Sequence, residues 1–172
     1  LVHRALTRSL DGRMDAGLAV RAMQSFLRHY ARENGAHCRI YPGVVEGLEA
    51  MRGRGLKLAC VTNKPQSFSE ALLAAQGLAP YFDMVVGGDR LPRRKPDPLP
   101  MLHVCERFGI EPGRMIAIGD SDNDAAAARA AGMPVLVVPY GYNEGRSAES
   151  IDADGIVASL ADVPPLLEGG QP

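Results

Sequence analysis

The sequence lacks an excess of charge of either sign, a cysteine framework and a long apolar run. Its 19 Lys and Arg residues balance 20 Asp and Glu residues, and no block of like charge occurs. This balance excludes a general electrostatic attraction for nucleic acid or an anionic membrane, so we expect a small molecule as the partner. The three cysteines are odd in number and far apart, which supports neither a disulfide framework nor a cysteine-based zinc site. We therefore expect a reducing, cytoplasmic setting.

Segments that would anchor or address the chain are also missing. The longest apolar runs, such as MPVLVVP, are far shorter than the ~20 residues that a membrane span needs. The first ten residues have neither the apolar core nor the small-residue cleavage site of a signal peptide. The chain opens at Leu1, without Met or a capping residue, in what reads as the middle of a helix. We therefore expect a missing front end.

The chain contains two consecutive segments that differ in their pattern of apolar residues. Residues 16–34 repeat apolar side chains at the spacing of an amphipathic helix, which predicts an all-helical segment over 1–40. From residue 41 onwards, helical patterns alternate with short, continuous apolar runs. These runs lie at 56–61, 84–88, 114–119 and 135–138, with helices predicted over 66–76, 99–108 and 122–131. The alternation predicts an α/β segment over 41–172, a Rossmann-like parallel sheet covered on both faces.

Polar side chains follow the first two runs of this α/β segment. Ligands of an open parallel sheet bind outside the carboxyl ends of its strands. Thr62 and Asn63 follow the first run and supply a hydroxyl, a carboxamide and exposed amides at a helix start, which suit phosphate oxygens. A turn with a capping residue is the alternative interpretation. Lys95 follows the second run, and it either cancels charge on a phosphoryl group and a nearby carboxylate or is simply solvated.

The third run ends in IGDSDNDAAAARAAG, residues 118–132, where three carboxylates fall within five positions. Asp122 or Asn123 is expected to cap the alanine-rich helix that follows. Asp120 comes directly after the strand and is a hard oxygen ligand suited to Mg²⁺, which takes one or two protein carboxylates plus substrate phosphate oxygens. Asp124 would then orient a metal-bound water or Lys95. The pattern alone leaves open whether Asp122 or Asp124 has that role.

In this combination the motifs resemble those of the haloacid dehalogenase-like hydrolases, and most of all the phosphoglycolate phosphatases among them. VTN at 61–63, Lys95 in RKPDP and GDSDND at 119–124 are similar to the second, third and fourth motifs of that superfamily. The resemblance implies Mg²⁺-dependent dephosphorylation of 2-phosphoglycolate to glycolate through an aspartyl-phosphate. It also implies that residues 1–40 are part of an α-helical cap.

The resemblance further implies a role for each matched side chain. Thr62, Asn63 and Lys95 would bind the phosphoryl group of a small phosphorylated metabolite. Asp120 would bind Mg²⁺. Lys95 and Asp124 would be the catalytic residues within this chain.

The first motif of these enzymes, DxDGT at the end of the first strand, does not occur in the sequence. Its first Asp attacks phosphorus, and its second protonates the leaving group and then activates water. SLDGRMD at 9–15 is a near match, but Leu10 stands where the first Asp is needed. We therefore expect an N-terminally truncated fragment whose core lacks its first strand and which is inactive by itself.

Three alternatives remain beside this interpretation. Another small-molecule phosphatase or a hexose-phosphate mutase of the same superfamily would share these motifs and differ in its cap. A non-catalytic domain that keeps the fold for protein contacts is a second alternative. A phospho-acceptor signalling domain is disfavoured, because its acidic residues precede Thr and Lys, whereas the order here is Thr62, Lys95, Asp120. The sequence leaves the exact substrate and the oligomeric state open.

Overall fold

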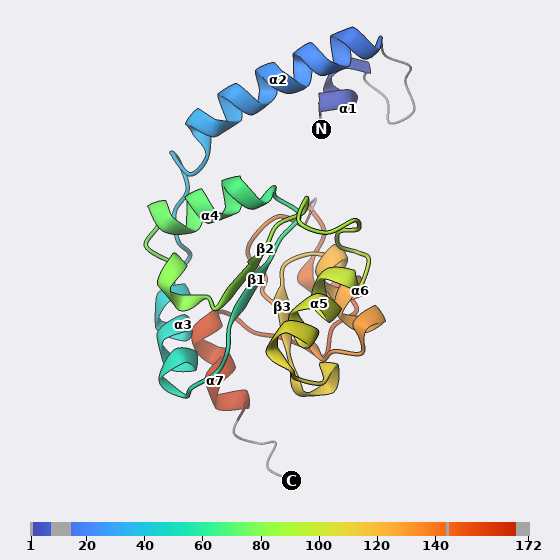
Figure 1. The fold of residues 1–172 in the computed structure, drawn as a ribbon. Coiled ribbons are helices and arrows are strands. Elements are labelled where there is room, and N and C mark those ends of the chain that lie inside the picture. The colour runs from blue at the N-terminus through green and yellow to red at the C-terminus, as the bar shows by residue number, and fades with distance from the viewer. Residues whose placement is uncertain (1, 8–14, 144, 168–172) are drawn as a thin grey trace. The chain divides into compact units, whose positions relative to one another are not determined.

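The computed structural model describes residues 2–7, 15–143 and 145–167 (Figure 1). The chain divides into two compact units, Leu1–Cys38 and Arg39–Pro172. Most of the SLDGRMD stretch, with Leu10, lies outside the described residues.

The first unit contains the helices α1 (Val2–Thr7) and α2 (Ala16–Glu33). The helix predicted over residues 16–34 is therefore present, one residue shorter. It begins where the Asp15 carboxylate accepts the Leu18 N–H at 2.8 Å, and it ends before Gly35, whose φ of 88° is left-handed. Phe26 and Tyr30 stack one turn apart, with ring centroids 5.3 Å from each other. The local capping and spacing signals thus account for this helix.

The second unit alternates helices and strands along the chain. Its α-helices are α3 (Val44–Gly53), α4 (Gln66–Ala75), α5 (Leu99–Phe108), α6 (Asp122–Ala131) and α7 (Val163–Leu166). Its strands are β1 (Ala59–Val61), β2 (Met84–Val86), β3 (Ala117–Gly119), β4 (Val135–Val137) and β5 (Gly155–Ile156). Four 3₁₀ turns join them: η1 (Ala79–Tyr81), η2 (Pro112–Arg114), η3 (Ala148–Ser150) and η4 (Leu160–Asp162).

All strand pairs are parallel, as the continuous apolar runs predicted. Their hydrogen bonds form two sheets and not one: β1 pairs with β2, and β3, β4 and β5 pair in that order. The strands are also shorter than the apolar runs that predicted them. The run at 56–61 contributes only Ala59–Val61, because the Leu58 N–H donates to the Asp83 carboxylate at 2.9 Å. The Leu58 carbonyl still accepts the Asp83 N–H, so a side chain replaces the backbone partner of the Leu58 N–H alone.

The side chains of strand β4 pack against helices on both faces of the sheet. Val135 and Val137 belong to an apolar cluster with α5 and α6, whereas Leu136 and Val138 belong to a cluster with α3 and α7. Successive side chains of a strand point to opposite faces, so β4 is covered on both sides. Burying each valine contributes roughly 1.5–3 kcal/mol. Figure 1 shows α3, α4 and α7 on one side of the strands and α5 and α6 on the other.

No helix in the described ranges combines the length and the apolar character that a transmembrane span requires.

Candidate active site

The ammonium group of Lys95 lies between the end of β1 and the start of α6. Its Nζ donates to Asp124 Oδ1 at 2.6 Å and to the Val61 carbonyl at 2.6 Å. The Lys95 and Asp124 side chains are 10% and 11% exposed, so this ion pair is largely withdrawn from water. One lysine thus connects the end of β1 at Val61 with the start of α6, the helix that follows β3 (Ala117–Gly119).

The Asp124 carboxylate is held by a network of donors. Its Oδ2 accepts the Ser121 hydroxyl at 2.6 Å, the Ser121 N–H at 3.1 Å and the Asp120 N–H at 3.3 Å. Burial alone would raise the pKa of Asp124, but the charge and hydrogen bond of Lys95 and the Ser121 and Asp120 donors together lower it. The carboxylate is therefore stabilised in its charged form.

The predicted cap of α6 is wrong. Ser121, and not Asp122 or Asn123, is the N-cap residue, because the Asp124 carboxylate reaches back to its N–H and hydroxyl. Asp122 instead forms an ion pair with Arg146. Asp124 is consequently the carboxylate that meets Lys95.

Asp120 lies under the loop that follows β4. Its Oδ2 accepts the backbone N–H of Tyr142 at 2.7 Å. Gly141 has a φ of +117°, and a Cβ there would overlap the Asp120 carboxylate, so only glycine fits this approach. Burial raises the pKa of Asp120, and the negative charge of Asp124 raises it further, although the Tyr142 N–H lowers it in part. Among the described residues, no cationic side chain forms an ion pair with this carboxylate.

The residues after β1 form a turn at the same edge. Thr62 Oγ1 accepts the Lys64 N–H at 3.1 Å, which is the contact of a turn residue. Asn63 Nδ2 donates to the Lys95 carbonyl at 2.8 Å, and its buried Oδ1 has no hydrogen-bond partner among the described residues. The expectation of exposed amides at the start of α4 is wrong for its first residue, because the Gln66 N–H donates to Asp89 at 2.7 Å.

Asn63, Lys95, Asp120 and Asp124 are linked by these contacts, and Thr62 adjoins them in the chain. Sequence reasoning did not find the roles of Ser121, Gly141 and Tyr142. A serine before an acidic residue three positions later is a capping signal that would have indicated Ser121. The Tyr142 contact comes from its backbone, for which no side-chain pattern exists.

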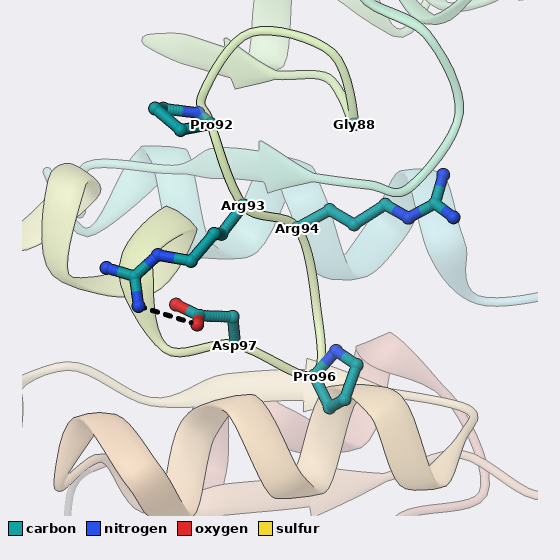
Figure 2. A pocket seen from close by; sticks show the side chains of 6 residues that line it. All are labelled: Gly88, Pro92, Arg93, Arg94, Pro96 and Asp97. Atoms are coloured by element: carbon teal, nitrogen blue, oxygen red, sulfur yellow. Dashed lines mark hydrogen bonds and ion pairs between the residues drawn. The ribbon is translucent and has the colours of Figure 1, made fainter.

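A cavity of about 700 Å³ opens beside this edge, in the loop after β2 (Figure 2). It is lined by Gly88, Pro92, Arg93, Arg94, Pro96 and Asp97. Arg93 donates to Asp97 at 3.0 Å, whereas Figure 2 shows Arg94 extending away from that pair. A smaller hollow of about 100 Å³ borders Asp120 and the loop at 138–148.

The donor set restricts which metal ion the site could hold. Within the described ranges, no three His, Cys, Asp or Glu side chains converge as a metal cluster. A lone carboxylate suits Mg²⁺, which keeps several waters and takes substrate phosphate oxygens as its remaining ligands. A cation beside Asp120 would also offset the repulsion that raises its pKa. Asp120 therefore fits a magnesium ligand.

A parallel α/β fold with a lysine–aspartate pair and a further aspartate at the strand ends defines a hydrolase core of a known type. The model of the haloacid dehalogenase-like hydrolases matches residues 3–132, and the chain belongs to this family. It is 54% identical over 168 residues to the phosphoglycolate phosphatase of Nitrosospira multiformis, covering 98% of this chain and 74% of that protein. It is 50% identical to the phosphoglycolate phosphatase of Thiobacillus denitrificans, with coverage of 94% and 71%.

Solved structures agree with this assignment. A Haemophilus somnus protein assigned as a phosphoglycolate phosphatase by prediction has a TM-score of 0.86 at 33% identity, covering 96% of this chain and 73% of that one. A Thermotoga maritima protein provisionally assigned as a β-phosphoglucomutase has a TM-score of 0.72 at 26% identity, with coverage of 99% and 77%. The fold is thus shared with proteins provisionally assigned to both classes of enzyme.

Proposed function

We propose that this chain belongs to a phosphoglycolate phosphatase, which hydrolyses 2-phosphoglycolate to glycolate and phosphate. The observation that carries the proposal is the buried Lys95–Asp124 pair, with Asp120 bonded to the same network, at one edge of the strands. The names of the relatives at 54% and 50% identity favour this substrate. The free state of Cys38, Cys60 and Cys105 supports a cytoplasmic location.

Each polar group has a distinct role in this proposal. The Thr62 hydroxyl and the Asn63 carboxamide hold phosphoryl oxygens, and Lys95 balances the charge that collects beside them. Asp124 fixes the direction of the Lys95 ammonium group through the 2.6 Å contact. Asp120 holds Mg²⁺, which supplies charge stabilisation to the phosphoryl group when it is bound.

Two roles are assigned to no residue of this chain: the nucleophile, and the acid that protonates the leaving group and then activates water. An aspartyl-phosphate route needs an aspartate that attacks phosphorus, and DxDGT does not occur in the 172 residues. The matched relatives are longer, since the chain spans 74% of the Nitrosospira protein.

We propose that residues 1–40 contribute to a cap that excludes water and selects the leaving group.

Phosphate release from 2-phosphoglycolate tests this proposal. The 172-residue chain is compared with a longer form that adds a strand carrying DxDGT, each with Mg²⁺ and with EDTA. We expect Mg²⁺-dependent turnover only in the longer form, because loss of a comparable nucleophile costs on the order of 10⁶ in turnover. In the longer form, Asp120→Asn should remove the Mg²⁺ dependence together with the activity. Turnover by the 172-residue chain, or full activity of Asp120→Asn, would contradict these roles.

A hexose-phosphate mutase is the second candidate, favoured by the Thermotoga likeness. The two functions differ in the fate of the phosphoryl group, since a phosphatase gives it to water and a mutase returns it to a sugar. Incubating the longer form with a hexose 1-phosphate therefore distinguishes them: formation of hexose 6-phosphate identifies the mutase, and release of free phosphate from 2-phosphoglycolate alone identifies the phosphatase.

A further inference from the structure

We propose that Arg94 binds a carboxylate on the leaving group, so that the site selects small phosphate esters that carry a carboxylate next to the ester. This inference rests on the proposed function and deepens it, because it identifies the side chain that binds the carboxylate end of the substrate. It concerns the 700 Å³ cavity of Figure 2, which no role described so far uses.

The loop that carries Arg94 is fixed to the edge where Asn63 lies. The Lys95 carbonyl accepts Asn63 Nδ2 at 2.8 Å, and the Gly88 N–H donates to the Lys64 carbonyl at 2.8 Å. A Cβ at Gly88 would overlap the Asn63 backbone, so the loop after β2 lies directly against the turn after β1. Arg94 is the chain neighbour of Lys95, with Cα atoms ~3.8 Å apart. The backbone that carries Arg94 is therefore held beside the turn that carries Asn63.

Of the two arginines that line the cavity, Arg94 is the one available to a ligand. Lys95 directs two of its three N–H donors to Asp124 and the Val61 carbonyl, and its third is left for a phosphoryl oxygen. Arg93 is committed to Asp97, 3.0 Å away. No hydrogen bond or ion pair of the Arg94 guanidinium occurs within the part of the chain that the structure describes, and Figure 2 shows this side chain extended to the opposite side from the Arg93–Asp97 pair. Its five N–H donors thus face only solvent or a ligand.

The chemistry of the guanidinium selects the kind of ligand. Its planar fork donates two parallel hydrogen bonds to a carboxylate, a geometry that an ammonium group lacks. Lys95 is suited to the phosphoryl group because it is a compact charge placed against Asp124, which also accepts the Asp120 N–H. A substrate with a phosphate at one end and a carboxylate at the other would engage both cations. An ester without the carboxylate would engage only Lys95.

Calorimetric binding to the 172-residue chain in the presence of Mg²⁺ tests this inference without requiring turnover. The probes are 2-phosphoglycolate and ethyl phosphate, which has a methyl group in place of the carboxylate. We expect 2-phosphoglycolate to bind about tenfold more tightly, the contribution of one exposed charge-assisted pair. Arg94→Gln should remove this difference and leave ethyl phosphate binding unchanged, and Arg94→Lys should restore only part of it.

Arg93→Gln is the matched control, because it removes the same charge from the adjacent position. It should keep the preference for 2-phosphoglycolate, and its effect should fade with added salt, as expected for a screened charge. Equal losses in Arg93→Gln and Arg94→Gln, or equal affinities of the two probes for the unaltered chain, would overturn the inference while leaving the phosphoryl site intact. Absence of binding by both probes would overturn the inference and the proposed function together.

Discussion

Lys95 and Asp124 form an ion pair in which both side chains are about nine-tenths buried. Such a pair is costly to desolvate, so its net contribution to stability is small while both partners are present. Removing one partner is different, because the other charge is then left buried and uncompensated. A substitution that removes either charge of the pair is therefore expected to lower the stability of the fold as well as to change the site.

Lys95→Met is expected to lower the free energy of unfolding by about 3 kcal/mol for this reason. Chemical denaturation with urea, followed by circular dichroism, measures the change. Arg93→Met is the control, because it breaks an exposed ion pair in the same loop and should cost less than about 1 kcal/mol. Equal losses in the two variants would show that Lys95 and Asp124 are solvated in solution.

Asp120→Asn is expected to stabilise the fold near neutral pH while it removes the proposed metal ligand. The folded state raises the pKa of Asp120, by burial first and by the charge of Asp124 as well, so the ionised carboxylate destabilises the fold. This cost is present above the folded pKa and absent below the unfolded value of 3.8. The melting temperature of the variant, measured without metal, should therefore exceed that of the unaltered chain at pH 7, and the gain should vanish as the pH falls below the unfolded value. A gain that persists in acid would indicate another cause.

At the scale of elements, the contact between α3 and η4 depends on a helical glycine. A Cβ at Gly47 would overlap the Leu160 carbonyl group, whereas nothing lies within 4 Å of the Cβ position at Gly53. Both residues belong to α3, where alanine is intrinsically favoured over glycine by ~1 kcal/mol.

Gly47→Ala is therefore expected to destabilise the protein by about 1–3 kcal/mol, since overlap with backbone outweighs the gain in helix propensity. Gly53→Ala, in the same helix, should be neutral or stabilising. Thermal unfolding of the two variants side by side measures the difference in sign. Stabilisation by Gly47→Ala would mean that η4 moves away from α3 at little cost.

The helices α2, α4, α5 and α6 were predictable to within one residue, because apolar periodicity is a local signal, whereas the four-residue α7 was missed. The predicted helix over 99–108 is α5 without any shift. The positions of the strands in the sequence were predictable, but their lengths were not. Side chains such as Asp83 accept the backbone N–H groups at the start of a predicted run, so these residues are not part of the strand. The strand β5 was missed, since its two residues, Gly155 and Ile156, form no apolar run. Pairing into two sheets depends on spatial neighbours, which periodicity does not encode.

The candidate site was predictable as far as side chains at strand ends are concerned. Parallel strands bring their carboxyl ends to one edge, so Lys95 and Asp124 could be placed together from the sequence. Contacts made by the backbone were not predictable. The Tyr142 N–H donates to Asp120, and the Lys95 carbonyl accepts from Asn63. Both contacts follow from loop conformation, and any residue type supplies such backbone groups.

At the scale of the whole molecule, the chain consists of the units Leu1–Cys38 and Arg39–Pro172. The helix α2 of the first unit has no buried residue, whereas β4 of the second unit is buried throughout. We propose that the boundary between cap and core lies at Cys38–Arg39, in a segment whose residues 36–39 are exposed.

Limited digestion with trypsin is expected to cut after Arg39 and to leave the segment from Ile40 onwards intact. Mass spectrometry of the products identifies the cut, and the melting temperature of the trimmed chain should equal that of the whole. Trypsin offers a fair test, because arginines such as Arg52, Arg107 and Arg129 occur throughout the second unit. Early cleavage at those positions would contradict the division.

The backbone of Tyr142, and not its ring, holds the Asp120 carboxylate, and the residue is 78% exposed. A substitution there keeps the N–H donor in place. The sequence contains no tryptophan, so Tyr142→Trp would introduce a single indole that can be excited apart from the remaining tyrosines. Its emission would follow the polarity and charge beside one carboxylate. A tryptophan at this position in the loop after β4 would therefore serve as an intrinsic fluorescence probe. Its emission would allow the binding of a cation or a phosphate to be timed without an attached label.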